Sequence, residues 1–113
     1  MSEQTLREPA FLVLTALAGE PQHGYSLVED VLQLSGGRVK LHTGSLYAVL
    51  DRLREAGLIE VDREEIVDSR LRRYYRLTSA GAERLAAEAE RMRVNARLAT
   101  SRLRRLRPAA GTR

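Results

Sequence analysis

The spacing of apolar residues predicts three short helices in the first half of the chain. Apolar positions repeat at helical intervals from about residue 8 to 18, from about 24 to 35, and from about 43 to 56. Gly19, Gly36 and Gly57 follow these segments, at the places where glycine commonly ends a helix. The pattern therefore predicts a small bundle of three helices.

The third predicted helix has its apolar residues on one face. They form an i, i+3, i+4, i+7 stripe, and His42 or Thr43 can cap the first turn. The stripe consists of Leu46, Val49, Leu50 and Leu53. Residues 38–41 before the cap alternate in polarity, which predicts a very short strand.

After Gly57 the polarity changes from helical to alternating. Residues 58–63 and 73–77 alternate between apolar and polar side chains, and a polar tip near Asp68-Ser69 separates them. This pattern predicts an antiparallel hairpin with a long arm. Tyr74 and Tyr75 fall on opposite faces of its second strand, and we expect Tyr75 to face the core.

The last segment predicts a long helix that begins near Thr78. From residue 85 onward, small or apolar residues recur at alternating intervals of four and three residues. This spacing is a heptad repeat, and it places these residues in one seam that is typical of a dimer interface. The seam consists of Leu85, Ala89, Met92, Ala96, Ala99, Leu103 and Leu106. Because alanine is frequent in it, we expect the seam to pack against both a partner helix and the helical body.

These elements predict a mainly α fold with a small β-hairpin: a winged helix-turn-helix followed by a long C-terminal dimerisation helix. The 113 residues suffice for one compact domain with an extension. We divide the chain into a DNA-binding domain at 1–78, the dimerisation helix at 79–107 and a disordered tail at 108–113.

Charge is distributed unevenly along the chain. Residues 1–90 hold 15 acidic and 11 basic residues, a net charge of −4, whereas residues 91–113 hold eight arginines and no acid. Contacts between an acidic body and nucleic acid must therefore come from local basic clusters. The densest cluster is Arg70, Arg72, Arg73 and Arg76, for which a plain solvated face is an equally good interpretation.

The composition argues against several other classes of protein. There is no cysteine, which excludes disulfides and thiolate metal sites and favours a cytoplasmic protein. The two histidines are far apart, and the chain lacks a glycine-rich phosphate loop and paired catalytic carboxylates, so we expect no enzyme, metal or cofactor. The apolar run near residue 11 is too short to cross a membrane.

The surface of the third helix opposite its apolar stripe suits a DNA groove. Gly44 and Ala48 let a helix approach base edges closely, and Tyr47 can reach phosphates or bases. Asp51 shares this face, with Ser45 and Arg52 at one flank. The alternative is an ordinary solvated face, although such faces usually carry more lysine and glutamate.

Three motifs together resemble the PadR-like transcriptional regulators. They are HGYSLVED at 23–30, TGSLYAVLDRLREAGLIE at 43–60 and SRLRRYYRLTSAGAERL at 69–85, in the order and spacing of that family. The single C-terminal helix is similar to that of the compact branch of the family, rather than to the branch with a longer helical C-terminal domain. The resemblance implies a homodimer that places two recognition helices in successive major grooves of a pseudo-palindromic, double-stranded operator.

The resemblance also implies which residues contact DNA. We expect contacts from Tyr25, Lys40, Thr43, Ser45, Tyr47, Arg52, Arg70, Arg72 and Arg73. Some members of the family release DNA when a small-molecule effector enters the space between the dimer helices and the body. By analogy, such a pocket would involve Phe11, Leu14, Met92 and Ala96, although residues such as Phe11 and Met92 are more often plain core residues.

The function predicted from the sequence is a homodimeric repressor that binds a specific DNA sequence and regulates its own or neighbouring genes. The alternative is a winged-helix module that binds another protein instead of DNA. The acidic body of residues 1–90 would suit a basic protein partner.

Overall fold

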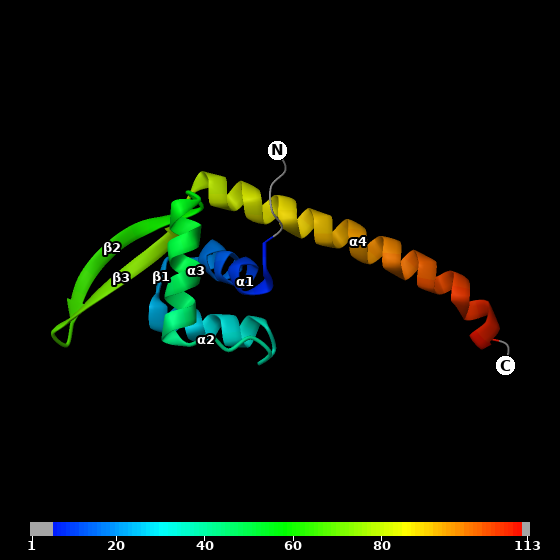
Figure 1. The fold of residues 1–113 in the computed structure, drawn as a ribbon, viewed down its shortest axis with the longest axis horizontal. Coiled ribbons are helices and arrows are strands. Elements are labelled where there is room, and N and C mark those ends of the chain that lie inside the picture. The colour runs from blue at the N-terminus through cyan, green and yellow to red at the C-terminus, as the bar shows by residue number, and fades with distance from the viewer. Residues whose placement is uncertain (1–5, 112–113) are drawn as a thin grey trace.

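The computed structural model describes the backbone of residues 6–111 and the side chains of residues 6–106. The elements are α1 (Glu8–Gly19), β1 (Gln22–His23), α2 (Gly24–Leu34), α3 (Thr43–Glu55), β2 (Ile59–Val67), β3 (Arg70–Leu77) and α4 (Ser79–Gly111). The first three helices form a body from which α4 extends as a long arm (Figure 1). The molecule measures 67 × 34 × 22 Å because of this arm. The predicted winged helix-turn-helix with a long C-terminal helix is confirmed.

The core lies between α1, α2, α3 and the inner face of β3. Helix α1 is central, since it contacts each of the other helices and β3. The largest fully buried side chains are Leu14, Leu27, Leu46, Leu50, Val13 and Val31. The predicted stripe of α3 faces this core. Tyr75 is only 2% exposed, which confirms its predicted orientation.

β2, β3 and their connecting turn form the wing. Asp68 and Ser69 both adopt positive φ, at 52° and 66°, and a two-residue turn of this kind matches the twist of a hairpin. The strands are antiparallel, with an irregularity in register between Val61 and Arg63. Such a bulge bends a hairpin and increases its twist, so the wing curves away from the body (Figure 1).

The prediction of a strand at residues 38–41 is wrong, because this segment is an irregular connection between α2 and α3. The third strand is β1, and the sheet order is β1-β3-β2. Its Gln22 side chain donates hydrogen bonds to the Ala16 carbonyl (3.0 Å) and the Asp30 carboxylate (2.9 Å). These bonds hold β1 between α1 and α2, beside β3. A strand of two residues has no periodicity, so only packing reveals it.

Helix α4 begins where the sequence predicts. The Thr78 hydroxyl donates to the Gly57 carbonyl (2.7 Å) and accepts from the Gly81 N–H (3.0 Å), which ties the start of α4 to the end of α3. The helix continues through Pro108 to Gly111. Residues 112–113 of the predicted tail lie outside the described residues, and the division of the chain into three parts stays a prediction.

Candidate nucleic-acid interface

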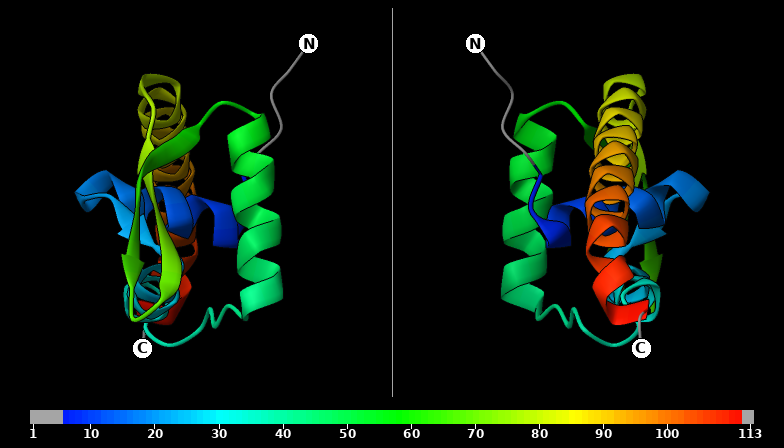
Figure 2. Two further views of the ribbon diagram at one scale, coloured as in Figure 1. Left: turned by 90° about the vertical axis from the view of Figure 1, so that its left-hand side faces the viewer. Right: turned by 90° about the vertical axis from the view of Figure 1, so that its right-hand side faces the viewer.

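A groove of about 620 Å³, which we call the wing groove, separates the wing from the beginnings of α2 and α3. The wing and α3 diverge from a common end, the turn that joins α3 to β2 (Figures 1 and 2). The groove is lined by His23, Gly24, Tyr25, Tyr47, Val67, Asp68, Arg70, Leu71, Arg72 and Arg73. It brings together five of the residues predicted to contact DNA: Tyr25, Tyr47, Arg70, Arg72 and Arg73.

Two exposed tyrosines line this groove. Tyr25, at the start of α2, is 73% exposed, and Tyr47, on α3, is 43% exposed. Within the part of the chain that the structure describes, neither hydroxyl has a hydrogen-bond partner. Both are therefore free to donate to a phosphate oxygen or a base edge.

His23 lies at the inner end of the groove and caps α2. Its Nδ1 accepts a hydrogen bond from the Ser26 N–H (3.4 Å), and its ring packs edge-on against Tyr74, with 5.2 Å between centroids. Burial lowers the pKa of His23 below its usual value, and the charge of Arg72 lowers it further against an opposing effect of Glu65. His23 is therefore an uncharged structural residue at neutral pH.

The wing arginines fall into two groups. Arg73 pairs with Glu64 at 2.8 Å, and Arg76 pairs with Glu60 at 2.7 Å. Neither Arg70 nor Arg72 has an ion pair or hydrogen bond to any described residue. Consequently, Arg70 and Arg72 are the arginines of the wing groove that have no ion pair within the described part of the chain, and the groove is also lined by the acidic residue Asp68.

The exposed residues near the start of α3 differ in whether their side chains already make hydrogen bonds within the protein. The Ser45 hydroxyl accepts from the His42 N–H and donates to the His42 carbonyl, both at 3.0 Å. Its donor is therefore used to cap the helix, and only acceptor capacity is left for DNA. Thr43, Gly44 and Ala48 are exposed beside it, so the helix end can approach a base edge closely.

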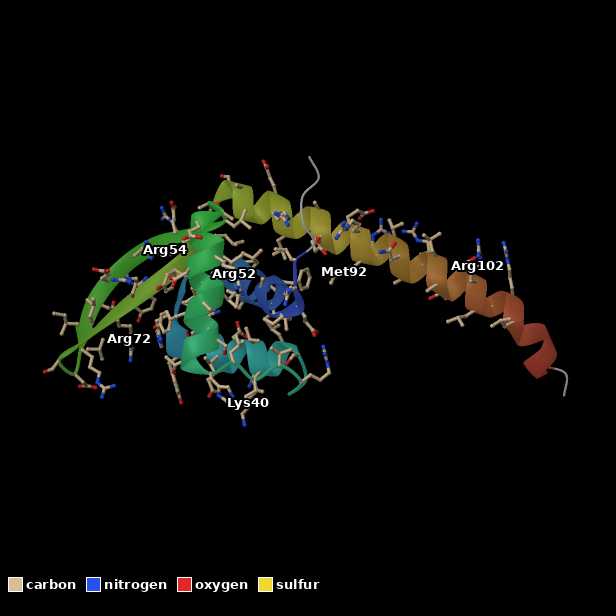
Figure 3. The ribbon with its side chains drawn as sticks, viewed as in Figure 1. Lys40, Arg52, Arg54, Arg72, Met92 and Arg102 are labelled. Carbon is tan, nitrogen blue, oxygen red and sulfur yellow. The ribbon has the colours of Figure 1, made fainter. Side chains whose placement is uncertain are left out.

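The remaining predicted residues lie outside the wing groove. Arg52 and Ser45 line a second groove, of about 950 Å³, bounded by the start of α1, by α3 and by Arg84 of α4. Lys40 is exposed on the connection between α2 and α3 (Figure 3). Arg54, which lines neither groove, is a further exposed arginine of α3. It is exposed two turns after Tyr47, and this seven-residue spacing is the signal that places both on one side of α3.

The family model described as the transcriptional regulator PadR-like family matches residues 13–87. The chain belongs to this family. The matched region contains most of α1, all of the other elements of the body and the wing, and the start of α4. Every residue that lines the wing groove therefore lies in the PadR-like part of the chain.

Solved structures of PadR-like proteins share the fold. A PadR family transcription regulator from Clostridium difficile R20291 superposes with a TM-score of 0.71 and 21% identity, covering 86% of this chain and 99% of its own. Bacillus subtilis PadR, solved in complex with operator DNA, has a TM-score of 0.64 and 22% identity over 72% of this chain and 47% of its own.

Among curated proteins, the chain is similar to an uncharacterized 37.1 kDa protein in transposon TN4556 of Streptomyces fradiae. The two are 41% identical over 81 residues, which is 72% of this chain and 22% of that protein. It also matches an uncharacterized protein X of Lysinibacillus sphaericus, with 27% identity over 62% of this chain and 64% of that protein. The chain thus spans less than two thirds of each of these relatives.

The predicted dimer seam of this PadR-like chain lies mostly in solvent. Leu85 packs against the core, whereas Met92 is 46%, Leu103 61% and Leu106 72% exposed. Ala89, Ala96 and Ala99 are exposed along the same face. A stripe of this kind on a projecting helix is what a second copy could cover, and the dimer stays a prediction.

The four residues predicted to form the effector pocket lie in two different environments. Leu14 is fully buried in the core, and Phe11 packs against that core, whereas Met92 and Ala96 are exposed on α4.

Among the described residues, no helix is long and apolar enough to cross a membrane. A search of the same residues finds no group of three or more His, Cys, Asp or Glu that could hold a metal ion.

Proposed function

We propose that this PadR-like regulator is a homodimeric repressor that binds a pseudo-palindromic operator upstream of its own or a neighbouring gene. The observation that carries the proposal is the wing groove, which is lined by Arg70 and Arg72, neither of which has an ion pair with a described residue, together with the exposed residues Tyr25 and Tyr47. Cationic and hydroxyl donors in one groove suit a phosphate backbone.

The geometry of B-DNA supports this assignment. When a recognition helix enters the major groove and a wing reaches the next minor groove, the strand between the two grooves passes between helix and wing. In this protein that position is the wing groove. Thr43, Ser45 and Tyr47 at the start of α3 then lie at the major groove or its rim, and Arg70 and Arg72 hold the wing on the backbone. Bacillus subtilis PadR, solved with operator DNA, has the same fold.

The seam on α4 supports the proposed homodimer. Two copies joined through Met92, Ala96 and Leu103 would place two α3 helices on one face of a duplex, and a two-fold protein reads a palindromic site. The space enclosed beside the seam would be the place for a small-molecule effector near Phe11 and Ala96. We assign the protein no enzymatic activity, and we place it in the cytoplasm.

A protein-binding winged helix without DNA binding is the second candidate. The observation in its favour is that the wing has no net cationic charge, because residues 59–77 hold five acidic residues and five arginines, and Glu60, Asp62 and Glu64 pair with Arg76 and Arg73. Together with the net charge of −4 over residues 1–90, this would suit a basic protein partner rather than a polyanion.

Fluorescence anisotropy with a labelled duplex of the DNA upstream of its own gene tests the proposal. We expect binding that weakens steeply with salt and resists competition by a scrambled duplex of equal length and composition. Equal competition by the scrambled duplex would contradict sequence specificity. Absence of binding to either duplex at low salt would favour the protein-binding module.

A further inference from the structure

The Tyr47 hydroxyl occupies the space that a side chain at position 24 would need. A Cβ placed on Gly24 would lie 2.8 Å from the Tyr47 hydroxyl oxygen, closer than real Cβ contacts allow. The other near atoms, Cζ of Tyr47 and Cδ2 of Leu46, would lie at 3.4 Å, an ordinary van der Waals contact. The hydroxyl oxygen is therefore the single atom that excludes a methyl group at this position.

No other property of position 24 requires glycine. Gly24 is not among the residues with positive φ, which are Asp68, Ser69, Gly36, Gly37 and Gly57. It is the first residue of α2, a helical position where alanine is more favourable than glycine. Glycine is therefore required at position 24 by the neighbouring tyrosine and not by the conformation of the backbone.

The surroundings decide which partner would yield if a methyl group were added. The chain before Gly24 is held in place, because His23 pairs with Tyr74 in the sheet and accepts from the Ser26 N–H. Tyr47 is 43% exposed, its hydroxyl has no partner among the described residues, and it borders the open wing groove. The tyrosine ring can therefore swing away while α2 stays in place.

We propose that Gly24 is a positioning residue for DNA binding, which keeps the Tyr47 hydroxyl against the start of α2 so that it donates to a backbone phosphate in the wing groove. This inference rests on the proposed function. The assignment is specific: Gly24 acts through the hydroxyl of Tyr47 and matters only while that hydroxyl is present.

A double-mutant cycle tests the proposal. The variants are Gly24→Ala, Tyr47→Phe and the two combined, measured for binding to the labelled upstream duplex and for thermal unfolding. Gly19→Ala is the matched control, because a Cβ there meets no atom within 4 Å. The loss of one hydrogen bond to a charged phosphate corresponds to about tenfold weaker binding.

We expect Gly24→Ala and Tyr47→Phe each to weaken binding by about tenfold per subunit, hence by about a hundredfold for the homodimer, and the combined variant to be no weaker than either alone. The melting temperature of Gly24→Ala should stay at or above that of the wild type. Independent, multiplying losses, unchanged affinity of Gly24→Ala, or a marked fall in its melting temperature would each overturn the inference. If the wild type itself fails to bind duplex DNA, the proposed function falls, and this inference falls with it.

Discussion

The carbonyl oxygen of Leu58 lies where a side chain on Gly81 would have to be, because a Cβ built on Gly81 would overlap it. The same carbonyl accepts a hydrogen bond from the Thr78 N–H (3.1 Å), so backbone from the start of the wing packs directly on the first turn of α4. This close approach sets the direction in which the long helix leaves the body.

We therefore predict that Gly81→Ala destabilises the fold. The Leu58 backbone and the first turn of α4 would have to move apart, which strains the Thr78 hydrogen bond, so the free energy of unfolding should fall by about 2 kcal/mol. Chemical denaturation measures this change. Gly19→Ala, which adds a methyl group in open space, should leave stability unchanged, and equal stability of the two variants would contradict the prediction.

The ion pairs of the wing predict which arginines bind DNA. Arg72→Ala should weaken binding to operator and scrambled duplexes alike, because its charge is unpaired and faces the wing groove. The slope of log K against log salt should fall by about 0.9 for each phosphate that the protein no longer neutralises, hence by about two for a homodimer. Anisotropy titrations over a range of salt concentrations measure this slope.

Arg76→Ala is the matched control for that experiment. Its guanidinium already pairs with Glu60 at 2.7 Å and Asp62 at 3.3 Å, and it does not line the groove. We expect little change in its salt slope. A fall as large as that of Arg72→Ala would show that ion pairing within the wing does not decide which arginines bind phosphate.

The lowered pKa of His23 predicts that the stability of the fold depends on pH. Its pKa is lowered in the folded state, chiefly by burial, so the unfolded chain takes up a proton first as the pH falls below about 6.5. The stability contributed by neutral His23 is thus complete above that pH and is lost as the pH falls toward the folded-state pKa. Protonation of Nδ1 would also remove the acceptor for the Ser26 N–H.

The test compares the wild type with His23→Asn, since asparagine can still cap α2 but does not titrate. The fall in melting temperature between pH 7.5 and pH 5.5 should be smaller in the variant than in the wild type. Parallel curves for the two proteins would contradict the assignment of the pH dependence to His23.

Introducing a negative charge into the seam tests the proposed dimer interface. Met92→Asp should give a monomer at micromolar concentration, because an unpaired carboxylate in a buried seam costs several kcal/mol. Val94→Asp is the control, since two residues along a helix turn the side chain to nearly the opposite face. Light scattering after gel filtration measures both masses, and a dimeric Met92→Asp would place the interface elsewhere.

Much of the fold could be predicted from the sequence. Helical spacing and terminal glycines placed α1, α2 and α3 within about two residues of their bounds. Alternation of polarity, with Asp68-Ser69 between the two segments, predicted the wing and the inward face of Tyr75. These features are local: side chains a few residues apart share a face whatever the rest of the chain does.

The tertiary structure decided what depends on residues far apart in the chain. Examples are the pairing of β1 with β3, the neutralisation of Arg73 by Glu64 while Arg72 stays unpaired, and the approach of Tyr47 to Gly24. The sequence by itself determined which residue types lie on which face of each element. Only packing of the elements against one another decided which of those side chains meet, because such a meeting depends on the distance between faces, and no local pattern contains that distance.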